Sequence, residues 1–364
     1  MAATSPRDER ELGEDEGDEE LQFSFLVIGD WGQVTSYTRS TSALMSGLAV
    51  EETLCRFVLA LGDNFYPSGV TSVSDRRWTS AWHHLYLCHP NLRMPWHAVL
   101  GNHDYEGEPA AQIEFTDSKK NASMGGFWHM PASSYSFSHH FELAPKRPSD
   151  SPDVEFFALD TNGCQEYIQR AYPFLREQLH ADILQLAAQL KSSPARFKIV
   201  YGHHPCYTKG IAHGKTGDLL REKELFKHGK SSPGFNLEQA LTEGGACAYF
   251  SGHEHVFQVC GGIFLFFLFI LLFILYFSFF KKHHYVNGVH HFVCGASGAF
   301  HPGYYCNEDR KRTMEWNDAK FHSGVVRVKV FKSHLQVEFW SSRTRTVIHT
   351  VQVQPPSKKI KRKS

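Results

Sequence analysis

Short runs of apolar residues alternate with amphipathic stretches over the first 250 residues of the chain. The runs have the length and composition of buried strands, and they cover residues 23–28, 57–60, a run that ends at residue 100, 154–159, 197–201 and 246–250. Apolar residues at helical spacing predict helices near residues 40–55 and 78–87, and a longer helix over 174–190. Strands that alternate with helices in this way are typical of an α/β fold.

Two other parts of the chain have a different pattern. Apolar and polar residues alternate at positions 326–330 and again at 335–339, which predicts antiparallel strands of a second sheet. Residues 105–140 are aromatic and rich in Gly and Ser, and this composition predicts a long surface excursion.

Polar residues of the metal-binding type cluster with a glycine at the ends of the apolar runs, and they are Asp30, Asp63, Asn102, His203, His253 and His255. Neighbouring strands of an α/β sheet present their carboxyl ends at one edge, so we expect these side chains to lie together. Their oxygen and imidazole donors suit divalent and trivalent ions. With Tyr66 they make seven ligands, which suits two ions that share a bridging carboxylate. Such a pair promotes in-line displacement at phosphorus, and the Tyr66 phenolate favours a trivalent ion such as Fe³⁺.

The motifs together resemble the signature of purple acid phosphatases, and most closely the small tartrate-resistant type. They are Asp30-x-Gly32, Gly62-Asp63-x-x-Tyr66, Gly101-Asn102-His103-Asp104, Gly202-His203-x-Pro205 and Gly252-His253-x-His255. The resemblance covers roughly residues 22–350. It implies a calcineurin-like metallophosphoesterase fold, a four-layer αββα sandwich of two mixed β-sheets flanked by helices.

The resemblance also implies a role for each site residue. Fe³⁺ would be held by Asp30, Asp63, Tyr66 and His255, and Asp63 would bridge to a second ion, Fe²⁺, Zn²⁺ or Mn²⁺, that is held by Asn102, His203 and His253. A metal-activated hydroxide would then attack a phosphate monoester at acidic pH. His103 would orient the phosphate or protonate the leaving alkoxide, and His213 would be a second catalytic histidine, in a loop one residue longer than in the family.

Charge is concentrated at the two ends of the chain. The totals are 38 basic and 38 acidic residues, so no bulk field indicates a nucleic-acid partner. Residues 7–20 hold nine acidic residues and 358–363 hold five basic ones. We therefore expect an acidic disordered tail over 1–21, a catalytic domain over 22–353 and a basic tail over 354–364. Eight cysteines without a Cys-x-x-Cys pair argue against a structural zinc site.

One apolar segment interrupts the catalytic domain. Residues 263–280 carry no charge and are followed by Lys281 and Lys282, which meets the length of a membrane-spanning helix. A single span here would have to leave and re-enter a packed sheet. Three interpretations stay open: a spurious insertion over 263–285 from a gene-model error, a genuine membrane anchor, and an extra buried helix.

The favoured function is an acid phosphatase that acts on phosphate monoesters. One alternative is a phosphodiesterase of the same superfamily that uses a divalent pair, against which Tyr66 argues. The other is a membrane-tethered or inactive binding protein, if residues 263–280 are genuine. The family resemblance suggests a secreted or lysosomal enzyme, whereas residues 1–20 are polar and acidic and lack an apolar signal region.

Overall fold

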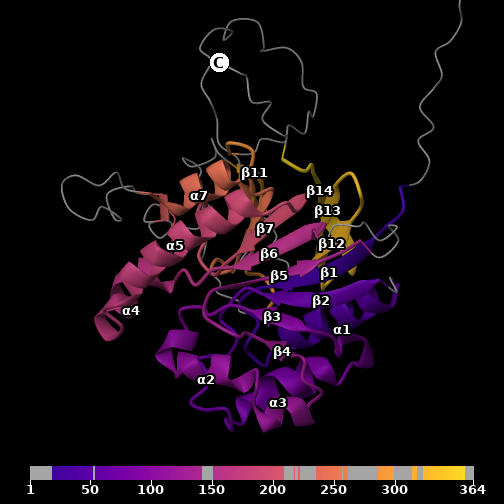
Figure 1. The fold of residues 1–364 in the computed structure, drawn as a ribbon. Coiled ribbons are helices and arrows are strands. Elements are labelled where there is room, and N and C mark those ends of the chain that lie inside the picture. The colour runs from indigo at the N-terminus through magenta and orange to yellow at the C-terminus, as the bar shows by residue number, and fades with distance from the viewer. Residues whose placement is uncertain are drawn as a thin grey trace, which may run out of the picture.

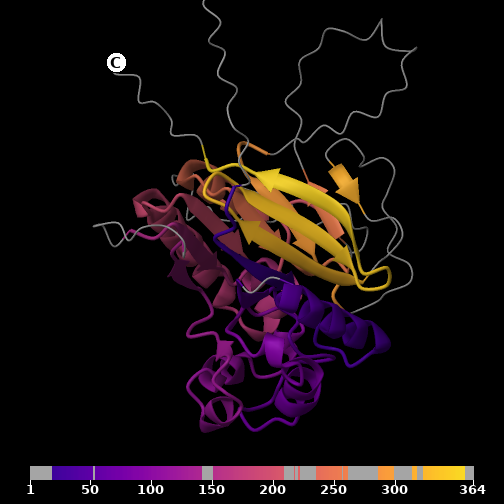
Figure 2. The same ribbon diagram turned by 90° about the vertical axis from the view of Figure 1, so that its right-hand side faces the viewer.

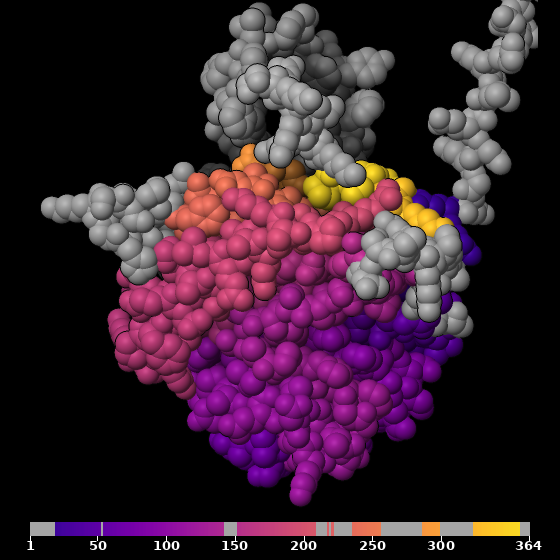
Figure 3. Space-filling view, in the orientation of Figure 1, coloured from indigo at the N-terminus to yellow at the C-terminus, as the bar shows by residue number. Residues whose placement is uncertain are grey.

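The structure, a computed structural model, places two β-sheets face to face with helices outside them (Figures 1 and 2). It describes residues 19–51, 54–141, 151–208, 217, 220–221, 235–255, 257–260, 286–298, 314–317 and 323–356. The space-filling view shows the indigo N-terminal part of the chain beside the yellow C-terminal strands (Figure 3).

Each sheet has seven strands within the described residues. The first sheet has the order β14-β13-β12-β1-β2-β3-β4, with β1 Phe23–Ile28, β2 Cys55–Ala60, β3 Trp96–Ala98, β4 Trp128–His129, β12 Gly324–Val330, β13 Leu335–Ser341 and β14 Thr346–Val353. The second has the order β11-β9-β10-β8-β7-β6-β5, with β5 Tyr135–His139, β6 Val154–Ala158, β7 Phe197–Tyr201, β8 Ala248–Ser251, β9 Phe257–Cys260, β10 His290–Cys294 and β11 Met314–Asn317. Both sheets combine parallel and antiparallel neighbours, as the resemblance implied.

Helices cover the outer faces of the two sheets (Figure 1). Those that follow β1 to β3 are α1 Ser36–Glu51, the π-helix η1 Trp78–Leu87, η2 Pro90–Leu92, η3 Asp104–Glu106, α2 Pro109–Phe115 and α3 Lys119–Ser123. Those that follow β6 and β7 are η4 Asn162–Cys164, α4 Glu166–Ala171, α5 Leu175–Ser192 and α7 Leu237–Gly244. The helices predicted near 40–55, 78–87 and 174–190 are thus confirmed, with ends shifted by a few residues.

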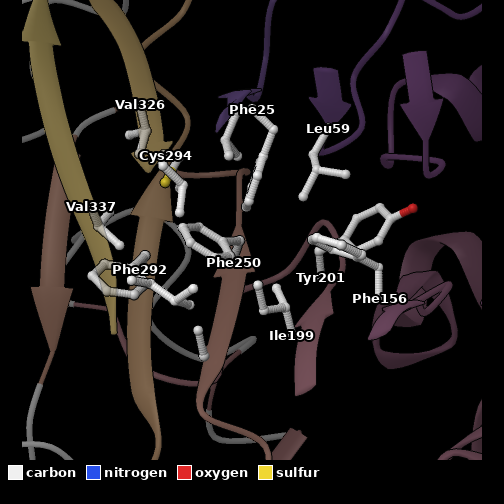
Figure 4. Packing of buried hydrophobic residues seen from close by; sticks show 14 of the residues in the cluster. Phe25, Leu59, Phe156, Ile199, Tyr201, Phe250, Phe292, Cys294, Val326 and Val337 are labelled. Atoms are coloured by element: carbon white, nitrogen blue, oxygen red, sulfur yellow. The ribbon is translucent and has the colours of Figure 1, made fainter. Parts of the chain in front are cut away.

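Three buried clusters correspond to the three interfaces between the four layers. Phe25 and Val326 of the first sheet face Phe250 and Phe292 of the second in the cluster between the sheets (Figure 4). A second cluster joins the first sheet to α1 and η1, and a third joins the second sheet to α5 and α7. The central strands are therefore covered on both faces, which is why their sequences are mostly apolar.

The prediction for residues 105–140 was wrong. The segment contains α2, α3, β4 and β5, so it supplies one of the two edge strands of each sheet. Trp128 is fully buried and Phe115 stacks on Trp78 with ring centroids 3.5 Å apart. Large aromatic residues of this segment thus form part of the core, and the segment is built of short helices and strands.

The strands at 326–330 and 335–339 are antiparallel, as predicted, but they do not belong to the second sheet. β12 pairs with β1, with Val27 opposite Val326, so β12 to β14 extend the first sheet. The open edge of β1 decides this pairing, and an alternating pattern does not contain that information. Both faces of β12 are covered, and on the outer one the buried Arg327 pairs with Glu338 at 2.7 Å.

Residues 263–280 lie outside the described residues, and so does His213. In the part of the chain that the structure describes, none of the helices combines the length and the apolar character needed to cross a membrane.

Candidate metal centre

The predicted ligands come together where the carboxyl ends of the central parallel strands of both sheets meet. Asp30 follows β1, Asp63 follows β2 and Asn102 lies beyond β3, and these three strands are parallel neighbours. From the other sheet, His203 follows β7 and His253 follows β8. A hydrogen bond joins the ligand-bearing loops of the two sheets: the backbone N–H of His253 donates to Asp30 Oδ2 at 2.9 Å.

Three of these residues have strained backbones. Asp30, Asp63 and His253 have φ values of 55°, 52° and 69°, in the left-handed region that costs a residue with a side chain about 1 kcal/mol or more. The chain is also tightly packed here, since a Cβ on Gly101 would lie 2.2 Å from the Asp63 nitrogen. The strain turns each side chain from the strand end into one small space, and the glycines let the loops approach.

The first group of donors surrounds the Tyr66 hydroxyl. It donates to Asp63 Oδ2 at 2.7 Å and lies 3.4 Å from Asp30 Oδ1 and 3.3 Å from His255 Nε2. His255 Nε2 is also 3.4 Å from Asp30 Oδ1. Burial and the charges of Asp63 and Asp30 raise the pKa of Tyr66 well above its usual value. A phenolate would therefore need a strongly charged cation in this space.

The second group of donors meets at Asn102 Oδ1. His203 Nε2 lies 3.0 Å from this oxygen and His253 Nδ1 lies 2.9 Å from it, while the two nitrogens are 3.2 Å apart. His203 Nδ1 is 2.8 Å from the Leu61 carbonyl, which can only accept. That bond puts the ring proton on Nδ1 and leaves the lone pair of Nε2 directed into the site, the usual arrangement of a metal-binding histidine.

Asp63 belongs to both groups. Oδ2 accepts from Tyr66, and Oδ1 lies 3.4 Å from His203 Nε2. Burial raises its pKa, but His203 and His103 outweigh this and lower the pKa of Asp63 overall. Burial instead raises the pKa of Asp30 well above the ordinary value. Oxygen and imidazole donors of this kind, with two buried carboxylates among them, suit metal cations. In each of the triads Asp30-Asp63-His203 and His203-His204-His253, one ligand atom of each residue lies within 4.8 Å of the others.

His103 lies at the rim of the centre and is half-buried. Its backbone N–H donates to Asp63 Oδ1 at 3.0 Å, and its Nδ1 is 2.7 Å from the Pro67 carbonyl. Its ring lies beside that of Tyr66, with centroids 4.6 Å apart. Burial lowers its pKa, but Asp63 and the Pro67 carbonyl raise it overall.

The structure gives Asp104, which stands in one of the motifs, a role that the sequence did not assign, and it adds two residues that the sequence patterns missed. The Asp104 carboxylate accepts N–H groups from both ligand-bearing loops, and burial and the charge of Asp63 raise its pKa to about 7. The Tyr167 hydroxyl lies near the Asn102 side chain, and Gln165 Nε2 lies 3.4 Å from His253 Nε2. Both come from the start of α4, which follows the strand end at Asp160. A search for polar residues after every strand end would have pointed to this segment.

Comparison with known proteins places the chain among phosphoesterases. Residues 23–257 match the family described as Calcineurin-like phosphoesterase. Purple acid phosphatase 17 of Arabidopsis thaliana is 34% identical over 236 residues, 65% of this chain and 63% of that protein. Tartrate-resistant acid phosphatase type 5 of Oryctolagus cuniculus is 28% identical over 246 residues, 64% of this chain and 67% of the relative. The chain spans between 58% and 66% of four purple acid phosphatases of Arabidopsis thaliana.

Solved structures share the fold. GAP50, described as the anchor in the inner membrane complex of Plasmodium, superimposes with a TM-score of 0.69 at 22% identity, over 93% of this chain and 91% of that one. Purple acid phosphatase PPD1 from yellow lupin seeds gives 0.55 at 13% identity, over 92% and 54%. The comparisons confirm the resemblance to purple acid phosphatases and the calcineurin-like fold that the motifs implied.

Proposed function

Because the chain belongs to the calcineurin-like phosphoesterase family, we propose that it is an acid phosphatase that hydrolyses phosphate monoesters at a pair of metal ions. The observation that carries this proposal is the position of Asp63 between two groups of donors. One of its oxygens meets Tyr66 at 2.7 Å, and the other lies 3.4 Å from His203 Nε2. A carboxylate placed in this way can bridge two cations.

In this proposal Fe³⁺ takes Asp30, Asp63, Tyr66 and His255, and Fe²⁺, Zn²⁺ or Mn²⁺ takes Asp63, Asn102, His203 and His253. The ions, when bound, would neutralise the phosphate oxygens and lower the pKa of water. The Tyr66 phenol supports a trivalent ion in the first position, because its hydroxyl lies among Asp30, Asp63 and His255 and a phenolate donor favours Fe³⁺.

His103 is proposed to act on the substrate itself. Its Nδ1 is held by the Pro67 carbonyl, so Nε2 is the ring atom that remains for a phosphate or leaving-group oxygen. From the rim it would orient the phosphate or donate a proton to the departing alkoxide. His213, which lies outside the described residues, remains a predicted second catalytic histidine that would also act on the substrate.

Two alternatives differ from this proposal in measurable ways. A phosphodiesterase with a divalent pair would need no phenolate, so it would be colourless and would prefer diesters near neutral pH. A tethered or inactive binding protein would hold no catalytic metal pair. The GAP50 likeness, at 22% identity, concerns the fold alone and favours neither.

Metal content and substrate preference test the proposal directly. We expect the purified full chain to contain iron, to absorb visible light and to hydrolyse p-nitrophenyl phosphate faster than bis-p-nitrophenyl phosphate at acidic pH. Asp63→Ala should lose metal and activity together. A colourless protein that prefers the diester at neutral pH would establish the phosphodiesterase instead.

Tyr66→Phe separates the ligand role of the phenol from the rest of the site. Visible absorption should disappear, because a phenolate bound to Fe³⁺ is the expected chromophore, while the remaining donors still hold metal. Tyr86→Phe, which changes a buried phenol outside the donor groups, should keep the colour. Unchanged absorption in Tyr66→Phe would show that Tyr66 is not a ligand.

A further inference from the structure

A cleft of about 790 Å³ opens beside the metal centre. Tyr66 and Pro67 form its wall on the side of the centre, and Asp75, Arg76 and Arg77 line it from the loop that leads into η1. The cleft therefore begins at a proposed iron ligand and at the residue whose carbonyl holds His103. A substrate whose phosphate reaches the centre has room here for the rest of the molecule.

The acidic residue of the cleft is already neutralised. Asp75 accepts from Arg77 Nε at 3.1 Å and Nη2 at 2.7 Å, and from the Thr71 backbone N–H at 2.9 Å. Burial raises the pKa of Asp75, but these donors outweigh it and hold the pKa well below the usual range. Asp75 thus keeps its charge, and Arg77 balances it.

Arg76 supplies the positive charge that remains. It is exposed, and among the described residues its guanidinium has no ion pair or side-chain hydrogen bond. Lys120 adds a second cation behind the same loop, where its Nζ donates to the carbonyls of Ser74 and Asp75 at 3.2 and 2.9 Å. The loop is held in place by these bonds, so the charge of Arg76 faces a cleft with defined walls.

We propose that this cleft binds a second phosphoryl group of the substrate, so that the preferred substrates are organic bisphosphates. The inference rests on the proposed phosphatase function of the metal centre. A guanidinium can donate two parallel N–H groups to a phosphate. One phosphate of the substrate lies at the metal centre, its carbon skeleton lies against Tyr66 and Pro67, and its other phosphate meets Arg76.

A comparison of two sugar phosphates as substrates tests the inference. We would measure phosphate release from glucose 1,6-bisphosphate and from glucose 6-phosphate by the metal-loaded full chain, and take the ratio of the two kcat/KM values. The wild type should favour the bisphosphate. Arg76→Ala should lower the ratio about tenfold, as expected for the loss of one charge-assisted contact, and Arg76→Glu should lower it further.

Arg196→Ala is the matched control. Arg196 is also exposed, but it precedes β7 and so lies at the opposite end of the second sheet from His203. Its replacement should leave the ratio unchanged. Added salt should reduce the wild-type ratio and affect Arg76→Ala less, because an exposed charge pair is screened.

Each outcome bears on a different claim. A ratio that is the same in the wild type and in Arg76→Ala, in proteins that hydrolyse both sugars, overturns the bisphosphate inference and leaves the phosphatase proposal intact. Absence of hydrolysis of either sugar phosphate and of p-nitrophenyl phosphate by the metal-loaded wild type overturns both.

Discussion

Asn102 shows how one side chain can depend on a partner outside the donor groups. Its Oδ1 faces His203 and His253 at 3.0 and 2.9 Å, which leaves its amide nitrogen for the nearby Tyr167 hydroxyl. An amide can rotate by half a turn, and only the orientation with oxygen inward presents a metal ligand. We therefore predict that Tyr167 positions Asn102 for the proposed second ion.

Tyr167→Phe should weaken binding of the second ion about tenfold while the iron and its colour remain, because residues that orient a ligand typically contribute this much to affinity. Titration of the divalent ion into protein that retains its iron measures this affinity. Tyr172→Phe is the control, since Tyr172 lies on the same segment but packs against Tyr105, with ring centroids 5.1 Å apart, and not against a predicted ligand. Equal affinities in the wild type and Tyr167→Phe would contradict the positioning role.

At the scale of elements, Asp104 ties the loop after β2 to the loop after β3. Its carboxylate accepts from the backbone N–H groups of Asn64 at 3.1 Å and Gly101 at 2.8 Å, and from Gln112 Nε2 at 2.7 Å. Asp63 lies in the first loop and Asn102 in the second. The spacing of these two predicted ligands thus depends on one buried carboxylate that is not itself a proposed ligand.

Asp104→Ala should reduce the free energy of unfolding by about 3 kcal/mol, because several buried N–H groups would lose their acceptor. It should also lower the affinity for both ions. Asp104→Asn, which keeps one acceptor oxygen, should lose less. Denaturant unfolding and metal analysis measure the two effects, and a stable Ala variant with full metal content would contradict the assignment.

At the scale of the whole molecule, the pairing of β9 with β10 limits what lies between them. Cys260 is opposite His291, and Val286 is opposite Val289 across Asn287 and Gly288. Both turn residues have positive φ, 49° and 91°, as in a two-residue hairpin turn. Cys260 faces His291 and Val286 faces Val289, so only His290 lies between the two paired positions on β10. A regular antiparallel ladder therefore has room for one residue, opposite His290, between Cys260 and Val286. A single membrane crossing would separate strands that are hydrogen-bonded neighbours.

A variant that lacks residues 261–284 joins Cys260 to Tyr285 and completes this hairpin. It should fold, bind metal as the full chain does, and gain about 2 kcal/mol of stability from the shorter loop. Urea unfolding and metal analysis of both proteins give the comparison. Failure of the shortened chain to fold would show that the segment contributes to the core, and the spurious-insertion interpretation would be wrong.

The sequence by itself determined the local elements and the chemistry at their ends. β1 was predicted over its observed residues, since a run buried on both faces has to be mostly apolar. The metal-binding residue types at the ends of strands were visible for a similar reason, because carboxylates and imidazoles that follow an apolar run are rarely buried unless they are paired or bind a metal. These features depend on neighbours in the sequence, and a linear pattern records them.

Tertiary structure decided what depends on distant residues. The open edge of β1 decides which sheet β12 joins. Trp128 is a core residue because several elements pack together around it. The contact of Tyr167 with Asn102 joins positions that share no motif. Hydrogen bonds such as the one from His253 to Asp30 span 223 positions. Their geometry exists only once both sheets have packed, because neither partner constrains the other in the unfolded chain.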